Sequence, residues 1–212
     1  MNRSIWGVPV YHQPSGFSIK DFNEEENQTF AEILKKDYST YEDIPNEVRV
    51  LEDKGKLLER KELIRIRKLV DKAAQYYRKE VICMEADIRL SASWLTINWK
   101  GDADPTHKHW HSLFSLCYYP QVESGNLVLY AENRKNIFQR DFNWGMSYTK
   151  WNEFNCADWT IPVKSGDIVI FPSWVEHKST PNESNIDRWM IGVNYWLTGE
   201  LVLRGDLDRI IV

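Results

Sequence analysis

The second half of the sequence is a series of short apolar segments separated by turn residues. The segments span residues 94–99, 113–119, 127–130, 159–163, 168–172, 188–196 and 201–203. Short strand-like patterns punctuated by Gly, Pro, Asn and Asp are typical of antiparallel sheets. Many such strands in succession predict a β-sandwich or a jelly roll, and this feature limits the possible folds more than any other.

The first part of the chain is typical of helices. Apolar residues recur at three-and-four spacing over residues 57–81, and acidic residues that favour a helix start follow Asp21. Before these helices, residues 5–11 alternate as a short strand. We expect an edge strand there, because Pro9 lacks the N–H that a central strand needs.

The composition supports one folded unit. With 212 residues, 42% of them hydrophobic and 27% charged, the chain has the make-up of a soluble globular protein and the length to bury a core. We therefore predict an α+β fold in a single domain, 1–212. Its helical N-terminal part, 1–85, would pack on one sheet of a jelly-roll core, 86–212.

Charge and cysteine usage exclude several classes of partner. A net charge of −4 gives no electrostatic case for binding nucleic acid or an anionic membrane. Cys83, Cys117 and Cys156 are widely spaced and form no CxxC pair, which is typical of reduced intracellular thiols. No signal-peptide core and no long apolar stretch is present, so we expect a cytoplasmic protein without a membrane partner.

Three of the five histidines alternate within a short run, as His107, His109 and His111. In an extended chain alternate side chains share one face, so these imidazoles would point the same way. Imidazole is the commonest protein metal ligand, and this spacing brings ring nitrogens toward one point. Polar residues on a solvated edge would give the same pattern, so a metal site needs a further ligand from elsewhere.

His177 is the candidate for that ligand, because it follows the buried strand at 168–172 and lies in the loop before the next strand. An HxH pair with a distant histidine can occupy one face of a metal and leave other positions open. Arg188 begins the next strand, and a buried guanidinium there would pair with a carboxylate. Its alternative role is a surface salt bridge with Asp187 or Glu183.

The segment 131–160 is long, polar and aromatic. Its aromatic residues are Phe138, Phe142, Trp144, Tyr148, Trp151, Phe154 and Trp159. A loop of this length in a compact domain is usually functional, for example as a lid, although it could instead be a hairpin that packs on the sheet. A lid of this composition would favour a substrate with a flat or apolar part.

Four stretches together resemble a known family. They are Ser93–Asn98, His107–His109 with Ser115 and Tyr118–Tyr119, Gly166–His177, and Arg188 with Asn194. This pattern is similar to the 2-oxoglutarate/iron(II)-dependent oxygenases, and more narrowly to a small bacterial and phage group related to their prolyl-hydroxylase-like branch. The resemblance covers residues 93–196, and FPSWVEH with the downstream arginine is its most specific part. It implies a double-stranded β-helix, a cupin-like jelly roll, with iron(II) at its open end.

The sequence departs from the family's metal motif, which is HxD or HxE followed by a distant histidine. Here His109 stands where the acid would be. His109 could itself bind the metal, or only His107 and His177 could do so, or the strand could slip so that His109 and His111 are the pair. We expect His107, His109 and His177, because this register also best places Tyr119.

The resemblance implies a site for 2-oxoglutarate as well. The cosubstrate would chelate iron through its 2-oxo acid end, and its distal carboxylate would meet Arg188 with help from Tyr119. Asn98 and Asn194 are further candidates for contacts around the metal or the cosubstrate. Glu176 is adjacent to His177 and should point away from the metal, so it would supply a carboxylate ligand only if the local backbone were bent.

The implied reaction is oxidative decarboxylation of 2-oxoglutarate to succinate and carbon dioxide, coupled to hydroxylation of a C–H bond. The primary substrate would be a small molecule or a peptide. Two other functions remain possible: a cupin-like three-histidine metal enzyme that does not use 2-oxoglutarate, and a non-catalytic jelly-roll binding module. The orientation of Arg188 tests the first, because the cosubstrate hypothesis fails if this side chain points away from the metal.

Overall fold

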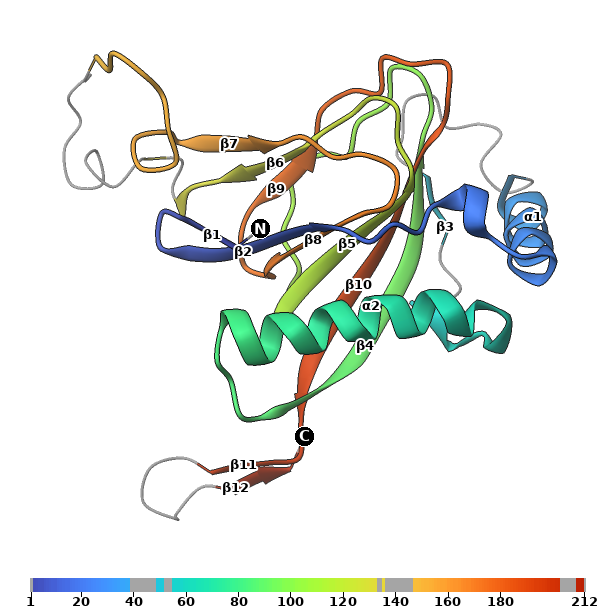
Figure 1. Ribbon diagram of the computed structural model, residues 1–212, viewed down its shortest axis with the longest axis horizontal. Coiled ribbons are helices and arrows are strands. Elements are labelled where there is room, and N and C mark those ends of the chain that lie inside the picture. The colour runs from blue at the N-terminus through green and yellow to red at the C-terminus, as the bar shows by residue number, and fades with distance from the viewer. Residues whose placement is uncertain are drawn as a thin grey trace.

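A large antiparallel sheet organises the chain (Figure 1). The computed structural model describes residues 2–38, 49–51, 55–132, 135, 147–202 and 209–211. The sheet has seven strands in the order β1 (Asn2–Ile5), β2 (Val8–Pro14), β8 (Asp167–Pro172), β5 (Phe114–Gln121), β10 (Arg188–Thr198), β4 (Asp87–Asn98) and β3 (Arg49–Leu51). A second sheet has the order β7 (Asp158–Ile161), β6 (Leu127–Tyr130) and β9 (His177–Ser179), and a separate hairpin joins β11 (Glu200–Val202) to β12 (Arg209–Ile211).

The two faces of the large sheet have different partners, because successive side chains alternate between them. On one face, residues such as Leu95 and Ile191 pack with Ile66 and Val70 in a core shared with the helices α1 (Glu24–Tyr38) and α2 (Ile64–Tyr76). Helix α2 lies across this face in Figure 1. On the other face, a second core joins the large sheet to the small one; it includes Cys117, Tyr119, Phe171 and Met190 together with Leu127, Leu129 and Ile161. The functional site lies on this second side.

Helix α1 starts as predicted from a run of acidic residues. Asn23 and Glu26 form reciprocal bonds, in which the Glu26 N–H donates to Asn23 Oδ1 and the Asn23 N–H donates to a Glu26 carboxylate oxygen. This capping box satisfies two of the N–H groups that a helix start leaves unpaired. Phe30 and Ile33 then turn one apolar face of the helix into the core.

The helix predicted over residues 57–81 is wrong at both ends. Leu57–Glu59 and Lys61–Leu63 are two 3-10 turns, separated by an extended Arg60. The adjacent Leu57 and Leu58 are both buried, and the N–H of Leu58 donates to Ser93 Oγ on β4 instead of to a helical carbonyl. Contact with the sheet therefore overrides the helical pattern there. After α2 the helix finishes with a π-helical turn, Tyr77–Val81.

The N-terminal strand is a hairpin and not one edge strand. Trp6 and Gly7 both adopt positive φ and turn β1 back into β2, so β1 forms the sheet edge. Pro9 lies on β2, outside the part of the strand, Tyr11–Pro14, that pairs with β8. The N–H that Pro9 lacks is therefore not needed for pairing with β8, which explains why the inner strand β2 tolerates a proline.

The remaining strand predictions are confirmed with small shifts, except that β4 begins at Asp87 and is twice as long as expected. Leu201 and Val202 belong to β11, whereas Leu203 lies outside the described residues. Strands β1 to β3 join the large sheet from within the first 85 residues, and the division of the chain at residue 85 stays a prediction. Of the aromatic segment, Phe138, Phe142 and Trp144 lie outside the described residues, so its role as a lid is also still a prediction.

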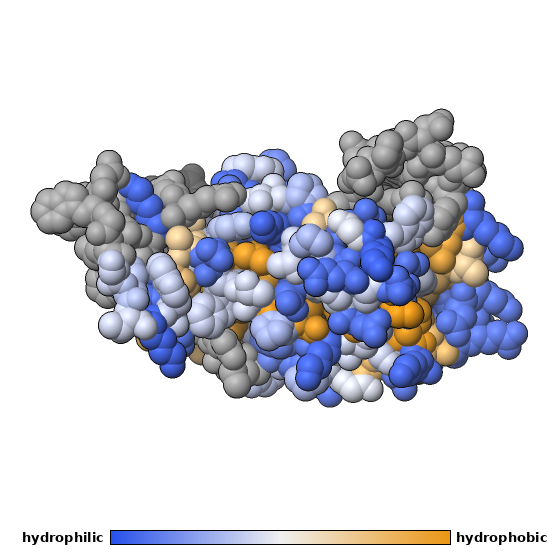
Figure 2. Space-filling view, turned by 90° about the horizontal axis from the view of Figure 1, so that it is seen from above, coloured by the Kyte–Doolittle hydropathy of each residue, from blue (hydrophilic) through white to orange (hydrophobic). Residues whose placement is uncertain are grey.

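The surface is consistent with apolar residues gathering in the two cores. The face in Figure 2 is mostly hydrophilic, and hydrophobic residues show only in limited areas between hydrophilic ones. All three cysteines are free thiols; Cys117 and Cys156 are buried, whereas Cys83 is exposed. Within the described ranges, the helices are too short and too polar to cross a membrane.

Candidate functional site

Three histidine rings gather between the two sheets. His177 is the first residue of β9, and His107 and His109 lie on the connection between β4 and β5. Their candidate ligand atoms all lie within 4.8 Å of one another. The ring centroids are 4.3 Å apart for His107 and His177, and 5.0 Å apart for both pairs that include His109. One ion can therefore contact all three imidazoles after small side-chain rotations.

Backbone hydrogen bonds bring these two segments together. His107 and His177 form an isolated antiparallel bridge in which each N–H donates to the carbonyl of the other at 2.9 Å. The N–H of His109 donates to the carbonyl of Ser173 at 3.0 Å. The connection after β4 is thus held against the chain around β9, and the three rings are placed by main-chain pairing.

His111 lies outside this group. The sequence pattern predicts an extended run with three imidazoles on one face, but the chain turns at Trp110 and His111, where φ of His111 is +62°. This left-handed backbone ends the alternation after two residues. Among the described residues, the histidines that come close enough to share an ion are His107, His109 and His177.

Two of the rings are oriented by hydrogen bonds to carbonyl groups. Nδ1 of His107 lies 2.8 Å from the carbonyl of Pro105, and Nδ1 of His177 lies 2.9 Å from the carbonyl of Val175. A carbonyl can only accept, so Nδ1 carries the proton in both rings and Nε2 keeps its lone pair. This arrangement is common for metal-binding histidines.

Burial keeps the inner two rings neutral. Desolvation, and next the neighbouring His107, lower the pKa of His177 to about 3 and that of His109 to about 4. Both imidazoles are therefore unprotonated near neutral pH and can act as ligands without first losing a proton.

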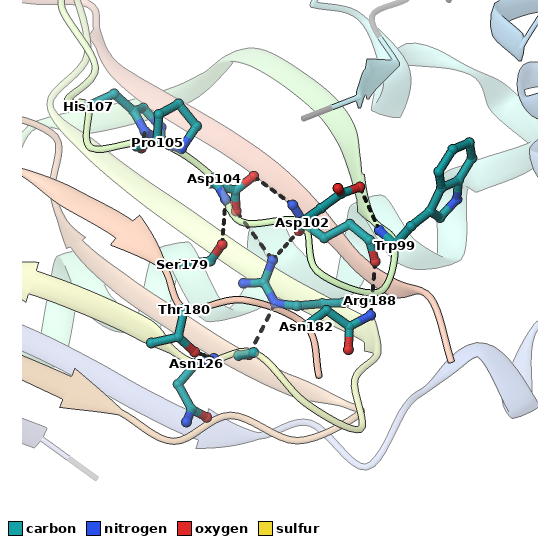
Figure 3. A network of polar contacts seen from close by, with 12 residues as sticks. Trp99, Asp102, Asp104, Pro105, His107, Asn126, Ser179, Thr180, Asn182 and Arg188 are labelled. Atoms are coloured by element: carbon teal, nitrogen blue, oxygen red, sulfur yellow. Dashed lines mark hydrogen bonds and ion pairs between the residues drawn. The ribbon is translucent and has the colours of Figure 1, made fainter. Parts of the chain in front are cut away.

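Arg188, the first residue of β10, reaches into the same region from the large sheet. Its side chain is 1% exposed. Nη1 donates to Asn98 Oδ1 at 2.6 Å and to Asp104 Oδ2 at 3.3 Å, and Nε donates to the carbonyl of Gly125 at 3.1 Å. Figure 3 shows the guanidinium turned toward Asp104, on the segment that continues to Pro105 and His107. Nη2 makes no hydrogen bond within the described part of the chain. The ion pair is thus buried, and the alternative role of a surface bridge to Asp187 or Glu183 is wrong.

Gly125 makes room for this arginine. Its φ is +93°, and a Cβ there would lie 2.8 Å from Arg188 Cδ. Any other residue would strain the backbone and press on the arginine stem. The glycine therefore serves both the turn before β6 and the placement of the guanidinium.

Tyr119 lies beside Arg188, with the guanidinium carbon 5.1 Å from its ring centroid. Its hydroxyl is buried and has no hydrogen-bond partner among the described residues. Burial, and next the Cys117 thiol, raise the pKa of Tyr119 well above 10, so the hydroxyl keeps its proton and can donate. Tyr118 points to the opposite face of β5, where its hydroxyl donates to the carbonyl of Phe17. Strand alternation thus places the two tyrosines as the sequence predicts.

These groups surround one pocket of about 350 Å³, a volume that includes its open mouth. The lining residues are Trp94, Asp104, His107, His109, Ser115, Leu116, Cys117, Tyr119, Leu127, His177, Lys178, Arg188, Met190 and Gly192. The pocket is therefore lined by histidines, a guanidinium and a tyrosine together.

The two predicted asparagines are not among the lining residues. Asn98 is fully buried and holds both members of the ion pair, since its amide nitrogen also donates to Asp104 Oδ1. Asn194 bonds to Ser115 Oγ at 2.8 Å, and Ser115 in turn bonds to Ser173 Oγ. The carbonyl of Ser173 accepts from the N–H of His109, so Asn194 contributes to the site only indirectly, through Ser115 and Ser173.

Sequence reasoning missed Asp104, which lies between the strand-like segments 94–99 and 113–119 and matches no motif there. The structure ties the segment around Asp104 to the end of β9 and to the chain that follows: the N–H of Asp104 donates to Ser179 Oγ at 2.6 Å, and the N–H of Gly101 donates to the carbonyl of Asn182 at 2.7 Å (Figure 3). The need of a buried arginine for an anion was the only signal that could have pointed to Asp104.

Comparisons with known proteins agree with this geometry. A family model described as "Putative 2OG-Fe(II) oxygenase" matches residues 92–194, the range that holds the three histidines and Arg188. No curated protein matches the sequence significantly.

Several solved structures share the fold. The non-heme alpha ketoglutarate dependent epimerase SnoN from nogalamycin biosynthesis is 13% identical, with a TM-score of 0.58 over 92% of this chain and 82% of that one. A 2OG-Fe(II) oxygenase family oxidoreductase from Burkholderia pseudomallei is 12% identical, with a TM-score of 0.52 over 88% and 83%. HygX from Streptomyces hygroscopicus, with nickel and 2-oxoglutarate bound, is 15% identical, with a TM-score of 0.53 over 88% and 81%.

At these identities the solved structures show the fold alone, and they confirm the predicted double-stranded β-helix within an α+β chain. Residues 92–194, just under half of the chain, match the 2-oxoglutarate/iron(II)-dependent oxygenases, a family of enzymes that use iron(II) as cofactor and 2-oxoglutarate as cosubstrate.

Proposed function

We propose that this enzyme hydroxylates a C–H bond of a small molecule or a peptide, using an iron(II) ion held by His107, His109 and His177. The observation that carries the proposal is the shared pocket. Three imidazoles, a guanidinium and a tyrosine hydroxyl line the same pocket. These are the groups needed to hold a metal and the far end of a 2-oxo diacid.

The donor set fits iron(II). Imidazole nitrogen is a suitable ligand for iron, and three ligands on one side leave other positions open for the cosubstrate and for oxygen. His107 and His177 already present Nε2 with a free lone pair, because their Nδ1 atoms are bonded to carbonyl groups. With His109 in place of an acid, the protein supplies no negative charge to the ion, so the bound metal would keep its full charge for an anionic cosubstrate.

Arg188 and Tyr119 fit the distal carboxylate of 2-oxoglutarate. The hydroxyl of Tyr119 is a buried donor without an acceptor among the described residues, and the guanidinium of Arg188 lies beside it with Nη2 not bonded there. Both residues line the pocket. A buried donor without a partner is costly, and a carboxylate would satisfy both groups at once. Because Nη1 and Nε are already bonded within the protein, the carboxylate would meet one arm of the guanidinium and not its full fork.

The chain's own residues would bind and orient while the bound iron and 2-oxoglutarate supply the oxidative chemistry. In the balanced reaction, 2-oxoglutarate, dioxygen and R–H give succinate, carbon dioxide and R–OH. The apolar side chains of Leu127 and Met190 line the pocket and limit the access of water to it. Tyr119, which stays protonated, would donate to the carboxylate without adding charge.

Two exposed tryptophans support a substrate with a flat or apolar part. Trp110 is 72% exposed next to His109, and Trp174 is 55% exposed in the turn before His177. Both come from segments that the His109–Ser173 hydrogen bond holds together. SnoN has been crystallised with nogalamycin RO, a small molecule, and a small-molecule substrate is our proposal for this chain too.

The Asp104 ion pair favours a second candidate, a cupin-like three-histidine metal enzyme that does not use 2-oxoglutarate. Arg188 is already neutralised, so it has less need of an external carboxylate. The orientation of the side chain argues the other way, because it points into the pocket and not away from it.

Succinate formation separates these functions. The iron-loaded protein would be incubated with 2-oxoglutarate and air, and succinate would be quantified against a metal-free sample and a His177→Ala variant. We expect succinate only with the iron-loaded wild type, at a low uncoupled rate without the primary substrate. Stoichiometric metal without succinate would support the cupin-like enzyme instead.

A further inference from the structure

The three histidines differ in what holds their rings. His107 and His177 each bond through Nδ1 to the carbonyl two residues earlier. The ring of His109 makes no hydrogen bond to any residue that the structure describes. A metal ligand normally has such a partner, because the second bond fixes the direction of the coordinating nitrogen. His109 must therefore be oriented by packing.

Trp94 supplies that packing. Its indole lies 5.1 Å from the His109 ring, centroid to centroid, at an interplanar angle of 50°. Trp94 projects from β4 on the pocket side of the large sheet and lines the pocket next to His109. Among the residues that the structure describes, the other aromatic neighbours of His109 are the two candidate ligands themselves, so Trp94 is its aromatic support there from outside the metal group.

Gly192 makes this contact possible. It pairs with Trp94 across β4 and β10, in the interior of a buried strand where glycine is unfavourable. Its φ is not positive, so the backbone conformation does not require glycine. A Cβ would overlap the six-membered ring of Trp94 and lie 2.8 Å from its Nε1. Strand β10 thus lacks a side chain at the position where the indole of Trp94 contacts it.

We propose that Trp94 is the positioning residue that holds His109 as a metal ligand, and that Gly192 provides the space in which the indole lies. This inference rests on the proposed three-histidine metal site. Aromatic contact on one face of the imidazole limits its rotation and keeps a ring nitrogen directed at the ion. Partners of this kind around a metal site typically change metal affinity by about 10- to 100-fold when they are removed.

The test is a titration of the metal-free protein with cobalt(II), followed by the ligand-field absorption of the bound ion. Trp94→Leu should weaken cobalt binding about tenfold or more. Its spectrum should approach that of His109→Ala, because both variants lose the same nitrogen. Trp94→Phe, which keeps an aromatic ring, should restore the wild-type spectrum and part of the affinity.

A double variant shows whether Trp94 acts through His109. In the His109→Ala background, Trp94→Leu should change cobalt affinity less than about twofold, because the ligand that it positions is already gone. Trp189→Leu is the matched control. Trp189 is also a tryptophan on the large sheet, but it is buried and packs on Phe30 on the helix side. This control should lower the melting temperature and leave the cobalt spectrum and affinity unchanged.

Gly192→Ala provides a second approach if Trp94→Leu folds poorly. The added methyl group should displace the indole and weaken cobalt binding, although Trp94 and His109 are both still present. Unchanged affinity and spectrum in Trp94→Leu and in Gly192→Ala would overturn the inference, and so would equal losses for Trp94→Leu with and without His109. If instead the wild type binds no cobalt or iron, the proposed metal site itself fails, which is a different result.

Discussion

His107 and His177 exchange two backbone hydrogen bonds, each 2.9 Å long, although they are 70 residues apart in the chain. The pairing places two imidazoles with ring centroids 4.3 Å apart before any metal is bound. A site that is built by the main chain requires little rearrangement to accept an ion, which favours tight binding.

Removing either paired histidine should abolish metal retention. We expect His107→Ala and His177→Ala to lose bound iron during gel filtration, because each removes a ligand that backbone pairing and an Nδ1–carbonyl bond hold in place, and the weak binding that remains shows only in titrations with excess metal. His109→Asp should still bind iron, since it restores a carboxylate at that position. His111→Ala is the matched control and should bind like the wild type, because His111 lies outside the group. Metal loss in His111→Ala together with retention in His107→Ala would contradict the assignment.

Tyr119→Phe should weaken 2-oxoglutarate binding without a cost in stability. The hydroxyl has no partner in the free protein, so its removal should leave the free energy of unfolding unchanged or raise it by about 1 kcal/mol. A hydrogen bond to a carboxylate is worth about 1.5 kcal/mol or more, so the affinity should fall about tenfold. Calorimetric titration of the metal-loaded protein with 2-oxoglutarate, in the absence of oxygen, measures this affinity.

Tyr118→Phe is the control for that substitution. Tyr118 faces the helix side, where its hydroxyl donates to the carbonyl of Phe17. The variant should lose about 1 kcal/mol of stability and bind 2-oxoglutarate normally. If both variants bound 2-oxoglutarate as tightly as the wild type, Tyr119 would have no part in the cosubstrate site.

Arg188→Met should keep the metal and lose 2-oxoglutarate, but it leaves the Asp104 carboxylate buried without its cation. Breaking a buried pair in this way costs about 3–5 kcal/mol, which endangers folding. The double variant Arg188→Met with Asp104→Asn removes both charges and should recover much of that loss. Chemical denaturation and calorimetric titration of both variants check this. Wild-type affinity for 2-oxoglutarate in the double variant would contradict the role of Arg188.

Acid should destabilise the metal-free protein. In the unfolded chain His177 takes up a proton near pH 6.5, whereas in the folded protein its pKa is about 3. Between these values the unfolded state binds more protons, so stability is full above pH 6.5 and falls as the pH is lowered toward 3. Between pH 7 and pH 5 the loss from this residue should be about 2 kcal/mol.

Urea denaturation of the metal-free wild type and of His177→Gln, each at pH 7 and pH 5, isolates that contribution. The variant should lose about 2 kcal/mol less between the two pH values, because it has no imidazole to protonate. A change in stability with pH that is the same in both proteins would show that burial of His177 does not lower its pKa.

The sequence predicts those site residues that follow strand alternation. Tyr119 rather than Tyr118 faces the pocket because side chains on β5 alternate, and His177 and Arg188 are found because each lies at a strand end. His111 shows the limit of this reasoning. One residue with positive φ turns the chain, and no local pattern announces that change.

Asp104 and Trp94 could not be predicted because their roles depend on segments far away in the chain. Asp104 reads as an ordinary turn residue until Arg188 is seen opposite it. Trp94 reads as a core aromatic until Gly192 is seen beneath it and His109 beside it. In the same way, the helical pattern at residues 57–63 breaks because Leu57 and Leu58 both pack on the sheet.

Binding of 2-oxoglutarate to the iron-loaded protein, in the absence of oxygen, tests the central claim most directly. Iron(II) chelated by a 2-oxo acid absorbs visible light through charge transfer, so the titration can be followed in a spectrophotometer. We predict a band that saturates at one 2-oxoglutarate per iron in the wild type and is absent in His177→Ala. Stoichiometric iron in the wild type with no band at saturating 2-oxoglutarate would contradict the account.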